Sequence, residues 1–290
     1  MYIRLFDVDW DEIKGTALPV GKIHFQTKIP GFIHVTPVVY LTTKTLQKTS
    51  DSLIINLANK IFKQVESTTS SNNIHYDELQ IDCDWTESTR VKYFALLNTL
   101  KKLELSQNVI LSSTIRLHQI KYPIATGIPP VNRGMLMFYN MGSLAASAQR
   151  NSIYNEYDAG KYAGYIHKYP LKLDIALPLF SWSKHTRNGH IIELISKLPI
   201  SDYNNNLNFT KTDSIIYIAT NSFFYRGFYF MKDDKIIIEQ MQALQCKTAA
   251  LQVDKELQKT QRSIVFFHFD SLTLSQYAKQ DLEEIFNIFN

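Results

Sequence analysis

The sequence predicts an α/β protein, a closed (β/α)8 barrel of the TIM-barrel architecture, with a β-hairpin inserted before strand seven. Three observations predict it. Eight strand-like runs recur along the 290 residues, helical segments separate most of them, and the phosphate loops GxGxxG and GxxxxGK[ST] are both absent. Single barrels commonly reach about this length. We therefore expect one domain, residues 1–290, with an insertion at about 201–234.

The expected strands are short apolar runs bounded by polar or turn-forming residues. In chain order they are Tyr2–Asp9, Ile33–Thr42, Glu78–Asp84, Val109–His118, Gly134–Asn140, Leu171–Phe180, Lys235–Glu239 and Ser263–Asp270. Two runs within the insertion, SIIYIAT and FFYRGFYFM, are typical of a hairpin. Eight strands that alternate with helices favour a parallel sheet with helices outside it.

Helical segments are expected between these strands, where apolar residues recur at helical spacing. The expected helices cover residues 52–65, 88–103, 190–198, 241–257 and 277–289. The first βα unit is the weakest of the eight. The helical region that begins at Asp11 is short and is interrupted by Pro19 and Pro30.

Composition narrows the classes of function. Hydrophobic residues make up 45% and charged residues 20% of the chain, as in a globular protein with an ample core. Aromatic residues reach 12%; their faces suit sugars, and they also fill cores. The net charge of +4 is scattered, which excludes the basic stripe of a nucleic-acid-binding protein. No run reaches the ~18 apolar residues of a transmembrane helix.

The two cysteines and the amino terminus do not determine the cellular compartment in which the protein works. Cys83 and Cys246 match no metal-binding spacing, and a disulfide between them stays open at this point. No secretory leader precedes the first strand at Tyr2. So abrupt a start suggests an exported or lipoprotein-anchored domain whose leader is missing from this chain.

Polar and aromatic residues stand where the expected strands end. In a (β/α)8 barrel the carboxyl ends of the strands meet at one rim, where the active site lies. Strands one and three end in nearly the same phrase, FDVDW and IDCDW. The strand-end residues are Asp7, Asp9, Trp10, Asp82, Asp84, Trp85, Arg116, His118, Tyr139, Asn140, Phe180, Trp182, Glu239, His268 and Asp270. The sequence predicts a binding or catalytic cleft among them.

Strand alternation predicts which of these side chains face the barrel axis. Residues i and i+2 of a strand share a face. Because Cys83 belongs to the apolar outer face, Asp82 and Asp84 face inward. Arg116 and His118 share one face of the following strand, and Arg116 is best placed to neutralise an aspartate of strand three. Such pairing matters because an unpaired buried carboxylate is costly.

Each of these groups also has a plain structural interpretation. A DxD at a strand end can cap the following helix. His118 and His268 can be hydrogen-bonded rim histidines without a catalytic role. Trp10, Trp85 and Trp182 can form a sugar-stacking platform or can pack against loops.

Three segments, STIRLHQIKYP, GIPPVNRGMLMFYNMG and YPLKLDIALPLFSW, resemble an uncharacterised bacterial family of unknown function. That family is grouped with glycoside-hydrolase-like TIM barrels. The resemblance covers nearly the whole chain, including FDVDW and QIDCDWT, and implies a barrel with a carbohydrate role in an often exported or lipoprotein-anchored product. It brings no catalytic residues. QIDCDW is also similar to the acidic strand ends of chitinase-like barrels, whose motif ends on a glutamate. Trp85 follows Asp84 here instead, which argues against a substrate-assisted mechanism.

The leading hypothesis is a glycosidase without metal or cofactor that acts on carbohydrate. Asp84 would be the acid, its pKa raised by the nearby Asp82 and Trp85. The second carboxylate would be Asp9 or Glu239. The remaining strand-end residues would bind the substrate, and the oligomeric state stays open.

Two alternatives stay open. A non-catalytic carbohydrate-binding or cell-envelope scaffold protein is favoured by the lack of a glutamate at the end of strand four. A metal-dependent hydrolase would use Asp7, Asp9, His118, His268 and Asp270, a set that suits Mg²⁺ or Ca²⁺ better than Zn²⁺. The HxH pair usual on the first strand of barrel amidohydrolases is absent.

Overall fold

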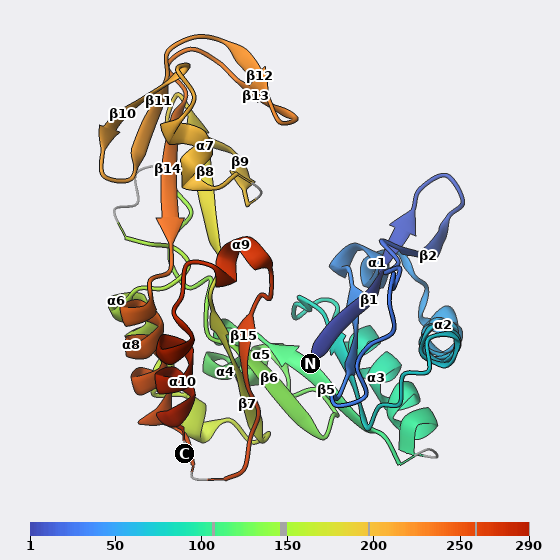
Figure 1. Cartoon of the computed structure of the whole chain (residues 1–290). Coiled ribbons are helices and arrows are strands. Elements are labelled where there is room, and N and C mark those ends of the chain that lie inside the picture. The colour runs from blue at the N-terminus through green and yellow to red at the C-terminus, as the bar shows by residue number, and fades with distance from the viewer. Residues whose placement is uncertain (106–107, 146–149, 197, 259, 290) are drawn as a thin grey trace. The chain divides into compact units, whose positions relative to one another are not determined.

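The computed structural model describes residues 1–105, 108–145, 150–196, 198–258 and 260–289 (Figure 1). It is a mixed α/β fold with an eight-stranded sheet and a separate five-stranded antiparallel sheet. Two compact units divide the chain. Unit 1 comprises residues 1–136 and 168–174, and unit 2 comprises residues 137–167 and 175–290. The division passes through two strands of the larger sheet, β6 (Arg133–Met137) and β7 (Leu173–Pro178).

The larger sheet has the strand order β15-β7-β6-β5-β4-β3-β1-β2. Its other strands are β1 (Tyr2–Asp11), β2 (Thr16–Val20), β3 (Thr36–Leu41), β4 (Glu78–Asp82), β5 (Ile110–Ile115) and β15 (Ile264–Phe267). Pairing is parallel between β1 and β3, β3 and β4, β4 and β5, β5 and β6, and β15 and β7. Seven expected strands thus lie in this sheet. In a closed barrel the first and the last strand of the order pair with each other. The order here begins at β15 and ends at β2, so closure into a barrel stays a prediction.

The eighth member of the sheet is an antiparallel strand that replaces the expected first helix. The Asp11 carboxylate accepts hydrogen bonds from the backbone N–H of Ile13 and of Lys14, both at 2.9 Å. Gly15, with φ of +60°, then returns the chain into β2. Pro19 is tolerated because β2 is an edge strand, where a missing N–H breaks no central ladder.

The seventh expected barrel strand belongs to the second sheet, so that expectation was wrong. Strand β14 (Lys235–Gln240) pairs antiparallel with β8 (Ser181–Arg187) and β11 (Ile216–Ala219). Strands β9 (His190–Ile195) and β10 (Phe209–Asp213) flank them, so a strand stands where a helix was expected at 190–198. A short apolar run such as KIIIE reads the same in a parallel strand and in a central antiparallel strand, since both are buried on two faces. The antiparallel sheet spans residues 181–240, and the expected insertion at 201–234 is only its middle.

An aromatic hairpin, β12 (Phe223–Tyr225) and β13 (Phe228–Phe230), follows β11. Its turn residues Arg226 and Gly227 both have positive φ, 46° and 89°, as a two-residue type I′ turn requires. Phe230 is buried in the core of the second sheet, and Phe223, Tyr225 and Phe228 pack against that core. The opposite face of the hairpin leaves Phe224 78% exposed.

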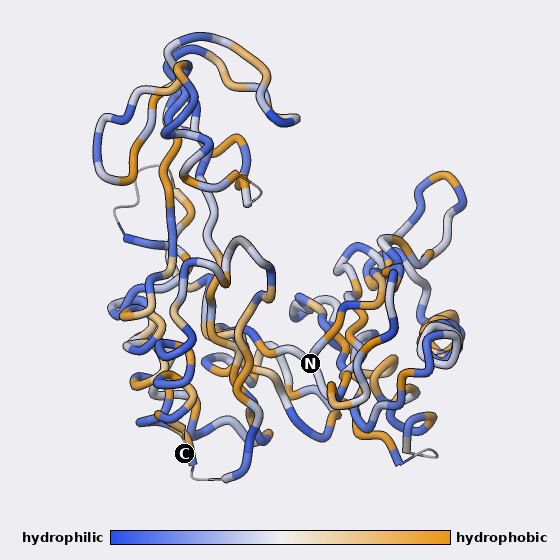
Figure 2. Tube along the Cα trace, viewed as in Figure 1, coloured by the Kyte–Doolittle hydropathy of each residue, from blue (hydrophilic) through white to orange (hydrophobic). Residues whose placement is uncertain are grey.

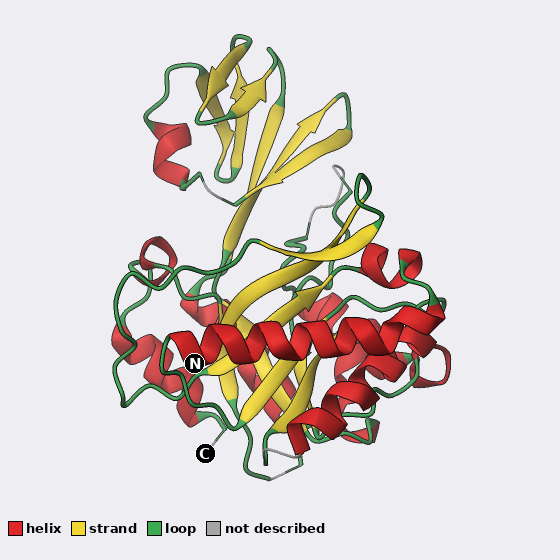
Figure 3. Ribbon diagram, turned by 90° about the vertical axis from the view of Figure 1, so that its right-hand side faces the viewer, coloured by secondary structure: helices red, strands yellow, loops and turns green. Residues whose placement is uncertain are grey.

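Two long helices cover the strands of unit 1, and Figure 3 shows them side by side in front of the sheet. The unit contains α1 (Thr43–Lys48), a short 3-10 turn η1 (Asp51–Leu53), α2 (Ile54–Ser71), α3 (Arg90–Leu105), α4 (Leu117–Lys121) and α5 (Pro123–Thr126). Along α2 the buried residues recur at helical spacing, from Ile54 through Leu57, Ala58 and Ile61 to Val65.

Unit 2 packs its helices against one another as well as against its strands. It contains α6 (Glu156–Ala163), most of a 3-10 turn η2 (Ile166–Lys168), α7 (Ile200–Asn204), α8 (Ala243–Asp254), α9 (Ser271–Leu274) and α10 (Lys279–Asn287). Helix α8 contacts α6 and α10. Hydrophobic and hydrophilic residues alternate along the turns of α8 and α10 (Figure 2), as expected for helices with one buried stripe.

Neither cysteine forms a disulfide: Cys83 and Cys246 are both buried and free. Burial raises the pKa of both thiols, which keeps them in the unreactive thiol form. Among the helices of the described residues, none combines the length and the apolar character needed to cross a bilayer.

A buried carboxyl near the end of α3 makes the stability of the protein depend on pH. Glu104 is fully buried, and neither of its carboxyl oxygens has a hydrogen-bond partner. Burial, and secondarily the charge of Glu66, raise the pKa of Glu104 from its ordinary value of 4.5 to about 7. The carboxylate of Glu66 accepts a 2.5 Å hydrogen bond from the Tyr76 hydroxyl.

The variant Glu104→Gln should gain stability relative to the wild type as pH rises from 4 to 8. Below the unfolded-state pKa the side chain is protonated in both states. Between about 4.5 and 7 only the unfolded chain ionises, so the wild type loses about 2–3 kcal/mol that the glutamine variant does not lose. Urea unfolding at pH 4, 6 and 8 measures the difference. The exposed Glu87→Gln should show no such trend, and parallel pH curves for wild type and Glu104→Gln would contradict the expectation.

Candidate active site

A row of side chains crosses four adjacent strands in unit 1, level with the carboxyl ends of β3, β4 and β5. Asp7 of β1 is the register partner of Tyr40 in β3, and Tyr40 is the partner of Asp82 in β4. The hydroxyl of Thr114, at the end of β5, donates a 2.7 Å hydrogen bond to the Asp82 carboxylate. In-register neighbours in a parallel sheet point to the same face, so the four side chains lie next to one another.

Asp82 is the carboxyl whose environment is most unusual in this row. Burial raises its pKa above that of an ordinary aspartate, and the negative charge of Asp84 raises it further. The hydrogen bond from Thr114 and the positive charges of Arg116 and Arg4 act in the opposite direction and only partly offset this rise. Asp82 therefore holds its proton to a higher pH than an exposed aspartate does.

Asp84 forms an ion pair with Arg116, as strand alternation predicted. The Arg116 Nε–H donates to the Asp84 carboxylate, and Nη2 contacts the same oxygen. Both side chains are partly exposed, 29% for Arg116 and 39% for Asp84, so the pair lies at the surface of the rim. The Thr43 hydroxyl fixes the local backbone by donating to the carbonyl of Asp84 at 2.8 Å.

A second arginine occupies the other end of the row. A β-bulge between Arg4 and Phe6 brings the Arg4 and Asp7 side chains together, and the guanidinium donates to both Asp7 oxygens through Nε and Nη2. The same guanidinium lies 4.5 Å from the centroid of the Tyr40 ring. Burial, followed by the charges of Asp84 and Asp82, raises the pKa of Tyr40, which keeps its hydroxyl a hydrogen-bond donor.

Asp9 has a structural function at this rim. One of its carboxylate oxygens accepts hydrogen bonds from the Thr42 hydroxyl at 2.9 Å and from the backbone N–H of Trp10 at 2.8 Å. Thr42 is also the N-cap of α1, accepting from the N–H of Thr45. Asp9 thereby ties the end of β1 to the start of α1, and Trp10 beside it is half-buried.

Two predicted binding residues of unit 1 lie elsewhere than strand alternation predicted. Trp85 is fully buried; its indole stacks on Tyr93 at 5.1 Å, and its N–H donates to the Thr126 carbonyl at 2.9 Å. It is a core residue, so a sugar platform at Trp85 is wrong. Strand β5 ends at Ile115, so Arg116 and His118 both follow it and do not share a strand face. The Gln119 side chain accepts from the Arg116 N–H at 2.7 Å, which starts α4 and leaves His118 exposed on that helix.

The predicted aromatic residues of unit 2 pack on one another. Tyr139 stacks on Phe267 at 5.3 Å, and Phe180 meets Tyr139 edge to face at 5.6 Å. Phe180 also contacts the edge of Trp182 at 5.3 Å and stacks with His268 at 6.4 Å. Tyr139 and Phe180 are buried, which leaves Trp182, Phe267 and His268 as the members of the cluster that reach solvent.

Glu239 is a buried structural carboxylate, and the expectation that it closes a barrel strand at the rim was wrong. It lies on β14 in the antiparallel sheet. Its oxygens accept hydrogen bonds from the Ser152 N–H at 3.1 Å, from the Ser152 hydroxyl and from the Trp182 indole at 2.7 Å. The Lys184 ammonium forms an ion pair with it at 2.8 Å, and both side chains are almost fully buried.

The last three predicted residues of unit 2 occupy loops. His268 Nε2 lies 3.0 Å from the Asp270 carboxylate. Asp270 caps α9 by accepting from the N–H of Thr273 at 2.9 Å. Asn140 is exposed in a left-handed conformation with φ of +55°. Within the ranges that the structure describes, no three His, Cys, Asp or Glu residues are grouped so as to hold a metal ion.

Comparisons with known proteins identify the fold. No family model matches the chain, and no curated protein matches it. Among solved structures, a chitinase from Chromobacterium violaceum ATCC 12472 is 9% identical, with a TM-score of 0.57 over 99% of this chain and 90% of that one. The spore cortex-lytic enzyme SleL from Bacillus cereus is 14% identical, with a TM-score of 0.55 over 100% of this chain and 67% of that one. The GH18 chitinase ChiB from Flavobacterium johnsoniae is 11% identical, with a TM-score of 0.55 over 99% of this chain and 86% of that one.

This chain has a glycoside-hydrolase-like, TIM-barrel-like fold. In that fold the carboxyl ends of the parallel strands carry the active site. The row of Asp7, Tyr40, Asp82 and Thr114 lies at those ends. Sequence reasoning missed Tyr40 because an aromatic residue in an apolar run normally fills the core. Its position just before the end of β3, level with Asp7 and Asp82, is the signal that could have found it.

Proposed function

We propose that the protein is a glycoside-hydrolase-like protein that binds carbohydrate and cleaves a glycosidic bond at the row of Asp7, Tyr40 and Asp82. The observation that carries this proposal is the raised pKa of Asp82 beside a second carboxylate, Asp84, at the carboxyl end of β4. Most glycosidases use two carboxyl groups that lie in different environments. The fold shared with chitinases and a cortex-lytic enzyme adds support.

In this mechanism Asp82 is the general acid. Its retained proton would pass to the leaving oxygen of the glycosidic bond as that bond breaks. Asp84, paired with Arg116, would face the positive charge that develops on the sugar. A water molecule would then add to the anomeric carbon and return a proton to Asp82. The sequence favoured Asp84 as the acid and Asp9 or Glu239 as the second carboxylate; Asp82 takes the role of the acid here because Arg116 contacts Asp84 directly. Tyr40 and Asp7 would orient substrate hydroxyls.

A second candidate, a carbohydrate-binding protein without turnover, is favoured by how fully the other rim carboxylates are engaged. Asp7 is held by Arg4, Asp9 by Thr42, and Asp84 by Arg116. The next acidic residue after Asp84, Glu87, is exposed in the loop beyond β4. A hydrolase needs a carboxylate able to activate water or attack the sugar, and in a binding protein these groups would only accept hydrogen bonds from hydroxyls.

Turnover on a glycan panel distinguishes the two candidates. Purified protein is incubated with chitin, with peptidoglycan and with soluble β-1,4-linked oligosaccharides, and new reducing ends are counted over time. The proposed hydrolase should release reducing ends from at least one of them in proportion to enzyme concentration. Depletion of protein onto a glycan without any product would select the binding protein. Neither product nor depletion on any substrate would overturn the carbohydrate proposal.

A further inference from the structure

Unit 2 contains a pocket of 360 Å³ that is lined in part by segments following β7 and β15 in the chain. The first residues of β8 and the last residues of β14 form one side of it, the start of α7 a second side, and the turn after α9 a third. Its volume falls within the range of about 300–1,000 Å³ that is usual for small-molecule sites. Loops leaving the carboxyl ends of parallel strands are also where such sites form.

The side chains that line this pocket are all uncharged. Six of them carry a hydroxyl or an amide: Ser181, Ser183, Ser201, Gln240, Ser275 and Gln276. Hydroxyls and amides both donate and accept hydrogen bonds, as sugar hydroxyls do. The rest of the lining is mainly apolar, with Leu198, Ile200 and Ile238. A charged ligand would lose hydration here without gaining an ion partner, whereas a neutral polyol would exchange water for matched hydrogen bonds.

The walls of the pocket are tied together before any ligand arrives. Ser181 is the register partner of Gln240, and Ser183 is the partner of Ile238, so the four residues form one patch across β8 and β14. The Gln240 amide donates to the Gln276 side chain, which links β14 to the turn after α9.

The Tyr277 hydroxyl strengthens that link by donating to the Leu179 carbonyl at 3.2 Å and to the Met241 carbonyl at 2.7 Å. Trp182, which also lines the pocket, is fixed by its hydrogen bond to Glu239. A pocket with walls held in this way loses little conformational entropy when a ligand binds.

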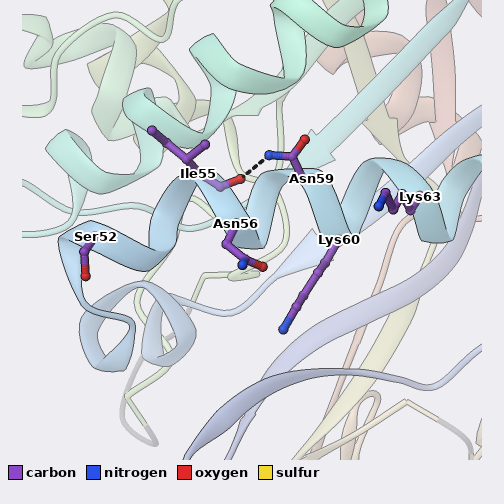
Figure 4. A pocket seen from close by; sticks show the side chains of 6 residues that line it. All are labelled: Ser52, Ile55, Asn56, Asn59, Lys60 and Lys63. Carbon is purple, nitrogen blue, oxygen red and sulfur yellow. Dashed lines mark hydrogen bonds between the residues drawn. The ribbon is translucent and has the colours of Figure 1, made fainter.

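A hollow on the surface of unit 1 differs from this pocket because it has no opposing walls. Figure 4 shows its lining side chains, which project from α2 and from the turn before it and point in different directions. Lys60 and Lys63 line it together with Asn56 and Asn59. All of the lining residues come from this one segment of the chain, so the hollow has no second wall. It therefore serves as the control surface for the experiment below.

We propose that the pocket between β8, β14, α7 and the turn after α9 is a binding subsite for a neutral sugar unit. The inference rests on the proposed carbohydrate function and adds where one sugar is held and which charge class it belongs to. The glycan bound there carries no carboxylate or ammonium on the unit in this pocket.

Titration calorimetry with three tetrasaccharides tests the subsite. The probes are N-acetylchitotetraose, which is neutral, its deacetylated cationic form, and anionic tetragalacturonate. The wild type should bind the neutral probe at least tenfold more tightly than either charged one. Ser201→Trp and Ser275→Trp, which fill the pocket from exposed positions, should weaken binding of the neutral probe at least tenfold. Ser52→Trp, in the hollow beside α2, should leave it unchanged.

The outcomes separate this inference from the function on which it rests. Wild-type binding that survives both pocket-filling variants would overturn the subsite while leaving the carbohydrate function standing. Equal affinity for neutral and charged probes would overturn the charge class. No binding of any probe by the wild type would overturn the subsite, and the glycan panel then decides the proposed function separately. Thermal unfolding of the two pocket-filling variants at the temperature of the wild type shows that lost binding is not lost folding.

Discussion

The variant Asp82→Asn should lose hydrolysis by about 10²–10⁴-fold in kcat/KM while keeping its fold. Asparagine has nearly the shape of aspartate and can still accept the hydrogen bond from Thr114, but it cannot give up a proton. The matched control is Asp77→Asn, an exposed residue just before the other end of β4, which should retain wild-type rates. Initial rates on whichever glycan the wild type cleaves measure both variants. A rate for Asp82→Asn within twofold of the wild type would exclude Asp82 as the acid.

The pH profile gives this assignment a second, independent readout. A general acid acts when protonated, so activity should fall as pH rises through the raised pKa of Asp82. The Thr114 hydroxyl donates to the carboxylate and favours its charged form, which lowers that pKa. Thr114→Val should therefore move the alkaline limb of the profile to higher pH without abolishing activity. A limb that stays in place or moves to lower pH would show that another group titrates.

The parallel strands could be predicted because each is a continuous apolar run between polar ends, a local signal. The strand β8, with sequence SWSKHTR, carries no such signal. Its Lys184 and His185 read as solvated residues, yet both are fully buried. His185 contacts the Asp234 carboxylate at 2.8 Å, and Arg187 donates two hydrogen bonds to the same group, both at 2.8 Å. The ionic partners that make β8 a central strand lie about 50 residues away in sequence, and no periodicity reveals them.

The candidate site likewise contains residues that the local sequence pattern predicted and residues that it did not. Strand alternation and the adjacency of consecutive strands predicted that Arg116 would neutralise an aspartate of strand three, and Arg116 pairs with Asp84. The positions of Trp85 and Glu239 depend on contacts with residues distant in sequence, and the sequence pattern predicted them wrongly. Trp85 turns into the core because Thr126 offers a buried carbonyl, and Glu239 lies in a sheet that local pattern could not separate from the barrel.

The second large effect concerns the buried ion pair between Lys184 and Glu239. Lys184→Met should destabilise the protein by about 3–5 kcal/mol, because it leaves the Glu239 carboxylate buried without its cation. The hydrogen bonds from Ser152 and Trp182 remain but do not neutralise the charge. Urea unfolding at pH 7 measures the loss, and the exposed Lys232→Met should change stability by no more than about 0.5 kcal/mol.

The double variant Lys184→Met/Glu239→Gln isolates the uncompensated charge. Glutamine keeps a carbonyl oxygen for the Trp182 indole or the Ser152 N–H and removes the negative charge, so the double variant should recover at least half of the stability lost in Lys184→Met. If the double variant is less stable than Lys184→Met, Glu239 contributes mainly through its hydrogen bonds, and the charge is not what Lys184 offsets. A change below about 1 kcal/mol in Lys184→Met itself would mean that water reaches the pair. The second sheet would then be held together by its aromatic core rather than by this ion pair.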